Sequence, residues 1–331
     1  MHNQTGNGIL EEFRVEFLGC WKRLPNKALF LCLLLAWLTL FQFLGNSTLG
    51  YVRTPSLFLY LYDAFSGGGK GLLDSEEGYG MFMPLVVLAL FWVKRRELMA
   101  IEFKPWWPAM LLVGLGLVLH VLGYLVQQPR ISVVGLFTGI FGMMGLAWGL
   151  AWMRAGFFPF FLLGFCVPLG SLAVPITFRL RLLVCWLVEA LSQNLLAIDI
   201  LREGTILKDP SGRYQYEVAA ACSGIRSQIA TLALAVVLAF FSLRSWPKRL
   251  IMIASAFPLA VLGNLLRMMA IVIAGEIGGQ DWGNYVHDGG PGGVFSLLPY
   301  LPAFAGLLYL EHLLRDDSPQ ASASNPVAKP A

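Results

Sequence analysis

Charged residues are scarce in this chain. Asp, Glu, Lys and Arg make up only 13% of its 331 residues, whereas soluble domains contain about 25%. So few charges cannot cover the surface of a water-soluble fold of this length, which excludes a soluble enzyme. The net charge of +4 is also small, and it gives no reason to expect a nucleic-acid partner.

Cysteine and histidine are equally rare. The chain has five cysteines and four histidines, with no C-x-x-C motif and no Cys/His spacing typical of a zinc site. The sequence therefore predicts neither a disulfide framework nor a metal site. No small-residue cleavage site follows the first apolar run, so a cleavable signal peptide is not expected. The cysteines are Cys20, Cys32, Cys166, Cys185 and Cys222.

Apolar residues, by contrast, make up 57% of the chain, and the mean hydropathy is +0.66. They form continuous runs rather than an alternating pattern, which is typical of membrane-spanning helices and not of barrel strands. A helix needs about 20 residues to cross a bilayer. We therefore predict an all-α, polytopic membrane protein with about eight transmembrane helices. The eight candidate runs are 28–45, 79–93, 106–126, 131–153, 155–175, 219–243, 250–275 and 294–314.

The segment 176–218 does not fit this pattern. Residues 176–200 are fairly apolar but carry several polar side chains, with Glu189 and Gln193 on one helical face. An amphipathic helix at the membrane interface fits this composition better than a ninth span. The turn sequence DPSG that follows favours a small external hairpin over residues 205–218.

The distribution of Lys and Arg predicts the orientation, because cytoplasmic loops are enriched in these residues. Basic residues are dense in 14–27, 94–104 and 244–249, whereas the loop 276–293 contains none. Eight spans with both termini in the cytoplasm agree with this asymmetry. The predicted regions are a cytoplasmic N-terminus (1–27), five N-terminal transmembrane helices (28–175), the external helix and hairpin (176–218), a three-helix region that holds the candidate catalytic residues (219–314) and a disordered cytoplasmic tail (315–331).

Polar side chains within membrane spans are costly and usually functional. Cys222 opens the sixth span at its outer end, Arg267 lies beyond the middle of the seventh, and His287 stands in the loop before the eighth. The predicted topology puts these three residues in the same outer layer. Three further polar residues lie within spans, namely His120, Arg226 and Asn264.

The three outer residues form a chemically complete set for acyl transfer. The thiol of Cys222 at a helix N-terminus is exposed to the positive end of the helix dipole, which favours the thiolate. Arg226, one turn later, or Arg267 would stabilise a thiolate or an oxyanion. His287 would deprotonate the thiol and protonate a leaving amine.

Each of these residues also has a structural interpretation. A single cysteine in a membrane helix often only fills space, and Arg267 would serve equally well to balance a carboxylate such as Glu276. Arg267 would also be explained if its charged end only extended to the membrane interface. His287 would be a solvated residue of a glycine-rich loop, and His120 would hydrogen-bond a neighbouring helix. Composition alone does not decide between these interpretations and the catalytic one.

The arrangement of motifs resembles a known family. The sequence ACSGIRS (221–227) opens one span, NLLR (264–267) lies in the next, and His287 precedes the last. This pattern, specific over residues 215–290, is similar to that of the exosortase/archaeosortase family of membrane cysteine transpeptidase-like enzymes. The resemblance implies a nucleophilic Cys222, a catalytic Arg267 from the N-x-x-R motif and His287 as the third residue, as in the bacterial branch. Arg226 and Asn264 take accessory roles, and no cofactor is implied.

The resemblance also implies a substrate class. Substrates of the family are secreted proteins with a C-terminal tripartite signal: a Pro-Glu-Pro-like motif, an apolar helix and a basic cytoplasmic cluster. Cleavage of this PEP-CTERM-like signal through a Cys222 thioester would pass the acyl group to water or to an amine, lipid or polysaccharide acceptor. The enzyme would lie in the cell inner membrane, with its active site facing the periplasm.

Two other functions are compatible with a polytopic protein that has few polar residues in its spans. One is a transporter, with Arg267 and His120 along a substrate path. Inverted repeats would support a transporter, and none is visible in the sequence. The other is a non-catalytic factor for exopolysaccharide export.

Overall fold

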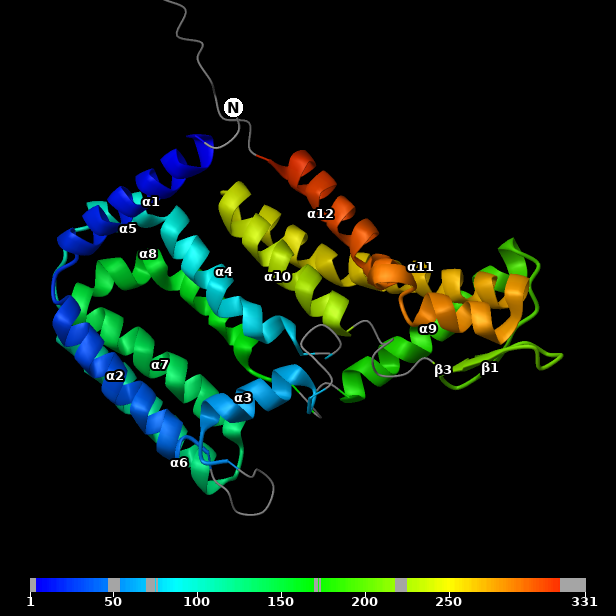
Figure 1. Cartoon of the computed structure of the whole chain (residues 1–331), viewed down its shortest axis with the longest axis horizontal. Helices are drawn as coiled ribbons and strands as arrows, with labels where there is room; N and C mark the ends of the chain where they lie inside the picture. Colours follow the sequence, from blue (N-terminus) through cyan, green and yellow to red (C-terminus); the bar gives the residue numbers. More distant parts are fainter. Residues whose placement is uncertain are drawn as a thin grey trace, which may run out of the picture. The chain divides into compact units, whose positions relative to one another are not determined.

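The computed structural model describes residues 4–46, 54–69, 75, 77–169, 172, 174–217 and 225–315 (Figure 1). The chain forms two compact units, Met1–Leu172 and Ala173–Ala331. Both are built mainly from helices.

The predicted all-α membrane class is confirmed. In the described part of the chain, five helices are long and apolar enough to cross a membrane, and three shorter apolar helices accompany them. Each of these helices corresponds to one of the eight apolar runs in the sequence. The long helices are Lys27–Leu44, Trp107–Leu125, Pro129–Trp148, Trp246–His287 and Val294–Leu314, and the shorter ones are Tyr79–Val93, Leu150–Cys166 and Ser227–Ser242.

The first unit is a helical bundle in which α6 and α7 pack against each other along their lengths. His120 of α6 is buried there, and its Nδ1 lies 3.2 Å from the Ser132 hydroxyl of α7. The structural interpretation of His120, as a residue that bonds a neighbouring helix, is therefore confirmed. The elements of this unit are α1 (Gln4–Arg23), α2 (Lys27–Leu44), α3 (Leu57–Ser66), α4 (Tyr79–Val93), α5 (Arg95–Ala100), η1 (Trp107–Ala109), α6 (Met110–Leu125), α7 (Pro129–Trp148), α8 (Leu150–Phe161) and η2 (Leu162–Cys166).

The break between the fourth and fifth runs differs from the prediction. The sequence suggested a loop at Arg154, but the chain turns at Gly149, and Arg154 lies within α8. Gly149 has φ 98°, and a Cβ atom there would lie 2.0 Å from the carbonyl oxygen of Lys104. Only glycine tolerates both the backbone angle and this close approach.

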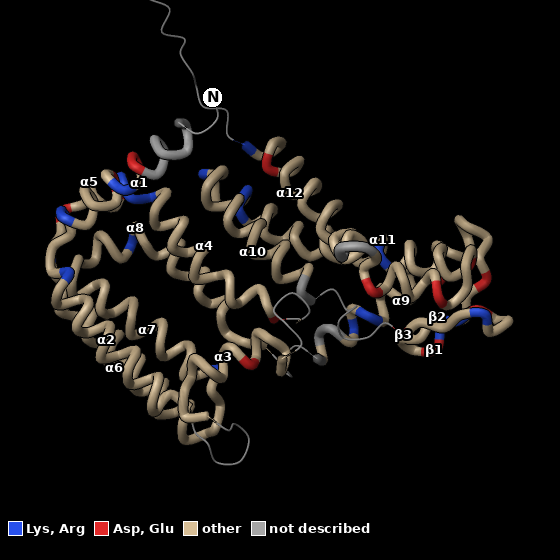
Figure 2. Tube along the Cα trace, in the orientation of Figure 1, with Lys and Arg blue, Asp and Glu red and all other residues tan. Residues whose placement is uncertain are grey.

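Basic residues of the first unit gather around α1 and α5 (Figure 2). These two helices adjoin the ends of apolar helices, since α2 begins shortly after α1 and α4 ends just before α5. The basic ends of several helices therefore meet at one side of this unit. The asymmetry is the one expected for a membrane protein with a fixed orientation.

The second unit has two packed cores. One joins α10, α11 and α12 through small and aliphatic residues such as Ala239, Ala256 and Leu307. The other joins α9 and a small sheet to α11. The elements are α9 (Val174–Leu195), β1 (Leu201–Glu203), β2 (Ile206–Lys208), β3 (Gln215–Glu217), α10 (Ile225–Ser242), α11 (Trp246–His287), η5 (Pro291–Leu297) and α12 (Tyr300–Leu314).

The predicted hairpin is present. Strands β2 and β3 pair antiparallel, with Leu207 opposite Tyr216, and the main-chain bond from Asp209 N to Tyr214 O closes the turn at 3.0 Å. Strand β1, which the sequence analysis did not anticipate, adds to the other edge of β2. The hairpin is thus one part of a three-stranded sheet.

Helix α9 occupies most of the predicted interfacial segment 176–200. It is not among the helices apolar enough to span a membrane within the described residues. Its polar face turns toward the sheet: Glu189 accepts a bond from Arg202 at 2.7 Å, and Gln193 Nε2 donates to the Ile200 carbonyl oxygen at 2.8 Å. Its position at the membrane interface stays a prediction.

Candidate functional site

The site is created by a reversal near the end of α11. Gly279 adopts φ 74° and ψ −165°, which breaks the helix into a main arm (246–278) and a return arm (280–287). In a straight helix, Arg267 and His287 would be separated by about 30 Å. Instead, Arg267 Nη2 donates to the His287 carbonyl oxygen at 3.1 Å. The chain has therefore doubled back, as Figure 1 shows for the end of α11.

The side chain of Tyr216 from β3 lies between the two arms. A Cβ atom at Gly275 of the main arm would lie 2.8 Å from the Tyr216 hydroxyl oxygen, and one at Gly283 of the return arm 1.8 Å from it. The hydroxyl donates toward the carbonyl oxygens of Gly279 and Gln280, at 3.5 and 3.4 Å. One glycine on each arm therefore makes room for the ring that separates them.

Polar contacts fasten the hairpin to both arms. Arg213 Nη2 donates to both carboxylate oxygens of Glu276 on the main arm, at 2.7 and 2.9 Å. On the return arm, Gln280 exchanges two bonds with the main chain of Gln215, at 2.7 and 3.1 Å. The sheet thus holds the reversal from outside the helical core.

Hydrogen bonds to carboxylates stabilise the turn of the hairpin. The Asp209 carboxylate accepts bonds from the Ser211 hydroxyl and from Arg213, and these bonds lower the pKa of Asp209 to about 2. Burial raises the pKa of Tyr214, whose hydroxyl donates to Glu276 at 3.2 Å. Asp209 therefore stays ionised and Tyr214 protonated at neutral pH, which keeps these bonds intact.

Arg267 does not balance Glu276, because Arg213 occupies that carboxylate. In the described part of the chain Arg267 forms no ion pair, and its Nε is buried without a hydrogen-bond partner there. Its guanidinium is partly buried and holds the main chain of His287. The structural interpretation that pairs Arg267 with Glu276 is therefore wrong.

Asn264 lies one turn before Arg267, on the same side of the main arm. Its side chain is only 1% exposed, and neither atom of its amide has a partner among the described residues. A buried amide without partners costs about 1–3 kcal/mol per unsatisfied group. Asn264 and Arg267 therefore together present unused hydrogen-bonding capacity at this level of α11.

His287 ends the return arm, with its side chain 34% exposed. Its Nδ1 lies 2.9 Å from the Asp288 carboxylate. A carboxylate at Nδ1 favours the proton on that nitrogen and leaves Nε2 as the basic one. Asp288 was not among the residues predicted from the sequence, although the HDGG sequence shows that it is adjacent to His287.

Two further candidate residues, Arg226 and Cys222, lie near the start of α10 in the sequence. Arg226 lies in the first turn of α10. Cys222 lies outside the described residues, between Glu217 at the end of β3 and Ile225 at the start of α10. The structure therefore brings Arg267 and His287 together, with Asn264 beside Arg267, and leaves the place of Cys222 as a prediction.

An apolar groove adjoins the site. It has a volume of about 780 Å³ and begins one turn beyond Arg267, at Ala270 of the main arm. Its far side is formed by the return arm up to Val286, the residue next to His287, and among the described lining residues only Asp281 is charged. The lining residues are Ala270, Ile273, Ala274, Ile277, Asp281, Trp282, Tyr285, Val286 and Phe295.

Comparison with known proteins gives one finding. A model of the family described as transmembrane exosortase (Exosortase_EpsH) matches residues 72–305. The matched stretch contains Cys222, Arg267 and His287, together with the whole reversal of α11. No curated protein and no solved structure matches the chain.

Proposed function

Because the chain belongs to the transmembrane exosortase family, we propose that it is a membrane-embedded cysteine peptidase or transpeptidase. Its substrates would be exported proteins with a PEP-CTERM-like C-terminal sorting signal. The observation that supports this most directly is the contact between Arg267 and His287, which lie 20 residues apart on a helix that folds back on itself.

The proposed reaction begins with the thiol of Cys222. His287 Nε2 takes the thiol proton, and the thiolate attacks the scissile carbonyl carbon. The negative charge that develops on the carbonyl oxygen is stabilised by Arg267 and by the amide of Asn264. As the carbon–nitrogen bond breaks, His287 returns the proton to the leaving amine, and a thioester remains on Cys222.

The second half of the reaction regenerates the thiol. Water, or the nucleophile of an amine, lipid or polysaccharide acceptor, adds to the thioester while His287 accepts its proton. The carbon–sulfur bond then breaks, and the proton passes to Cys222. Asp288 would keep His287 in the required tautomer throughout, as carboxylates do for catalytic histidines.

The apolar groove between the arms of α11 suits the apolar segment of such a substrate. An extended or helical segment lying there would bring its polar end to Arg267 and His287, because the groove begins within one turn of both. The basic residues of the first unit support the proposal of a cytoplasmic N-terminus, and with that topology the site would lie on the periplasmic side of the inner membrane.

The test is substrate processing by Cys222→Ala and Cys222→Ser in cells that lack the wild-type enzyme. Both variants should accumulate the full-length substrate, with at most a trace of processing by serine, because an alcohol is far less ionised than a thiol at neutral pH. Cys32→Ala is the matched control, since Cys32 is an exposed cysteine of α2, and it should process normally. Normal processing by Cys222→Ala would refute the proposed thioester mechanism.

A further inference from the structure

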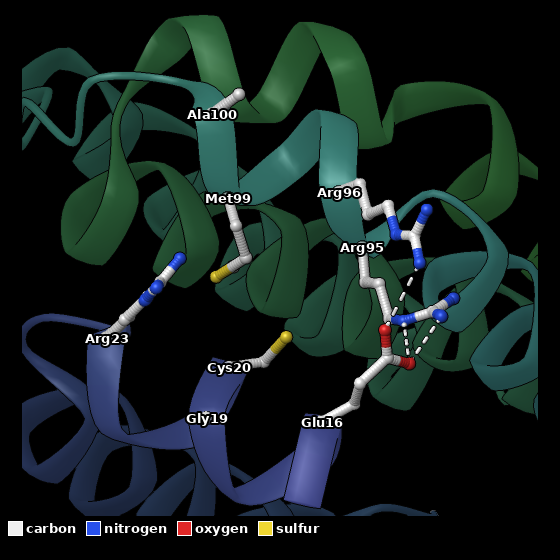
Figure 3. A pocket seen from close by; sticks show the side chains of 8 residues that line it. All are labelled: Glu16, Gly19, Cys20, Arg23, Arg95, Arg96, Met99 and Ala100. Carbon is white, nitrogen blue, oxygen red and sulfur yellow. Dashed lines mark hydrogen bonds and ion pairs between the residues drawn. The ribbon is translucent and has the colours of Figure 1, made fainter. Parts of the chain in front are cut away.

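A second pocket lies in the first unit, between α1 and α5 (Figure 3). It has a volume of about 390 Å³, and three arginines and one carboxylate are among the residues that line it. The lining therefore carries an excess of positive charge. Its residues are Glu16, Gly19, Cys20 and Arg23 of α1, and Arg95, Arg96, Met99 and Ala100 of α5.

Arg95 and Glu16 form the fixed part of this pocket. Arg95 donates to one Glu16 oxygen through Nε at 3.1 Å and through Nη2 at 2.5 Å, and its Nη1 donates to the Trp92 carbonyl oxygen at 3.0 Å. Its guanidinium also lies 4.4 Å from the centre of the Trp92 ring. These bonds lower the pKa of Glu16 and join α1 to α5, so Arg95 has little capacity for a ligand.

Arg23 and Arg96 are the two cations that remain. Arg96 has an 84% exposed side chain and touches Glu16 through one contact of 3.4 Å. Arg23 is exposed and has no hydrogen-bond or ion-pair partner among the described residues. Figure 3 shows their side chains projecting from α5 and α1 respectively, at the two ends of the pocket. A guanidinium group with unused donors suits the oxygens of a phosphate.

The pocket lies beside the ends of two apolar helices. Spanning helix α2 begins at Lys27, shortly after Arg23, and apolar helix α4 ends at Val93, just before Arg95. The adjoining stripe of α1 carries partly exposed aromatic rings, which stack on one another with centroids 6.1 and 6.4 Å apart. Trp favours the headgroup region of a bilayer, and Phe and Trp on one face of an interfacial helix lie at the boundary between headgroups and acyl chains. The rings belong to Phe13, Phe17 and Trp21.

We propose that this pocket binds the phosphate group of an anionic phospholipid. Basic pockets beside the ends of membrane helices recognise such headgroups through their charge. The aromatic stripe of α1 would lie among the headgroups and upper acyl chains, which distinguishes a lipid from a free phosphate ion. This inference does not depend on the catalytic function proposed above.

The test compares wild type with Arg23→Ala/Arg96→Ala, both purified in neutral detergent and titrated with phosphatidylglycerol or phosphatidylcholine. Native mass spectrometry counts the lipids that stay bound. Wild type should retain phosphatidylglycerol in preference to phosphatidylcholine. The double variant should lose at least about tenfold in affinity for phosphatidylglycerol, because each lost contact is charge-assisted.

The matched control is Lys104→Ala/Arg154→Ala, which removes the same charge from a different pocket of this unit. Lys104 there already pairs with Glu102 at 3.0 Å, and this control should bind phosphatidylglycerol like wild type. If the control lost as much affinity for phosphatidylglycerol as the double variant, general surface charge would explain the effect, and the proposal would be overturned. Unchanged binding by the double variant would also overturn it, as would soluble glycerol phosphate that binds as tightly as the lipid. If the double variant fails to fold, Arg23→Gln alone decides the question, since Arg23 has no partner in the described chain.

Discussion

Replacing Gly283 by alanine would test whether the reversal of α11 positions His287 against Arg267. The new Cβ atom would lie 1.8 Å from the Tyr216 hydroxyl oxygen and 2.3 Å from the ring carbon that carries it. Atoms so placed must separate by about 1 Å or more. Tyr216 is 4% exposed and stacks on Tyr214, so the return arm is the part that moves.

That movement has two expected consequences. Overpacking of this kind costs about 1–3 kcal/mol of stability, which leaves the enzyme folded. It also carries the His287 main chain away from Arg267, whose bond of 3.1 Å cannot survive a further 1 Å. Because a misplacement of about 1 Å at a reacting group costs roughly a hundredfold in rate, we expect processing to fall by about that factor.

The assay measures cleavage of a reporter that carries the tripartite signal, normalised to the amount of enzyme in the membrane. Gly306→Ala is the control. Its Cβ atom would lie 2.5 Å from a terminal methyl carbon of Leu259, a flexible side chain that can turn away. The control should cleave like wild type. Wild-type cleavage by Gly283→Ala at a normal enzyme level would show that the contact between the two arms is not needed, and the geometric argument would fail.

Three further predictions follow from the same structure. Arg267→Lys and Arg267→Ala should insert normally yet lose about a hundred- to a thousandfold in normalised processing, since an ammonium cannot replace the guanidinium fork; near-wild-type processing by the lysine variant would reject the catalytic role. In a variant without native cysteines, an impermeant thiol reagent applied from outside should label Glu203→Cys and not Ser245→Cys, and the reverse pattern would invert the topology. Because the pKa of Asp209 is lowered from 3.8 to about 2, its contribution to stability is complete above about pH 4 and is lost as the pH falls through 2. Asp209→Asn should therefore be less stable than wild type at pH 6 and equally stable near pH 1.5, as thermal unfolding in detergent would measure; a constant difference across this range would contradict the sign.

The helices could be predicted because membrane insertion imposes a simple rule on the sequence. Each span must be apolar along its whole length, so all eight runs were visible without any knowledge of their packing. Their ends were less certain. The turn at Gly149 depends on how closely Lys104 approaches, a contact between distant residues that apolarity does not encode.

In the site, too, the residues could be predicted from the sequence but their contacts could not. Arg267 and His287 were recognisable, since a charged residue within a span and a histidine beside it are rare, and the motif spacing resembled a family. Their direct contact was not predictable. It depends on one left-handed glycine, Gly279, and on Tyr216, a residue more than 60 positions away that fits between two other glycines. Neither feature has a signature within its own stretch of sequence.

Strand β3 connects two parts of the candidate site. Through Gln215 and Tyr216 it fixes the return arm and therefore the main chain of His287. The same strand is the last described element before Cys222, and α10 begins soon after that residue. Under the proposed mechanism, a sheet placed there would constrain both the approach of Cys222 and the position of His287, although the two residues follow different helices.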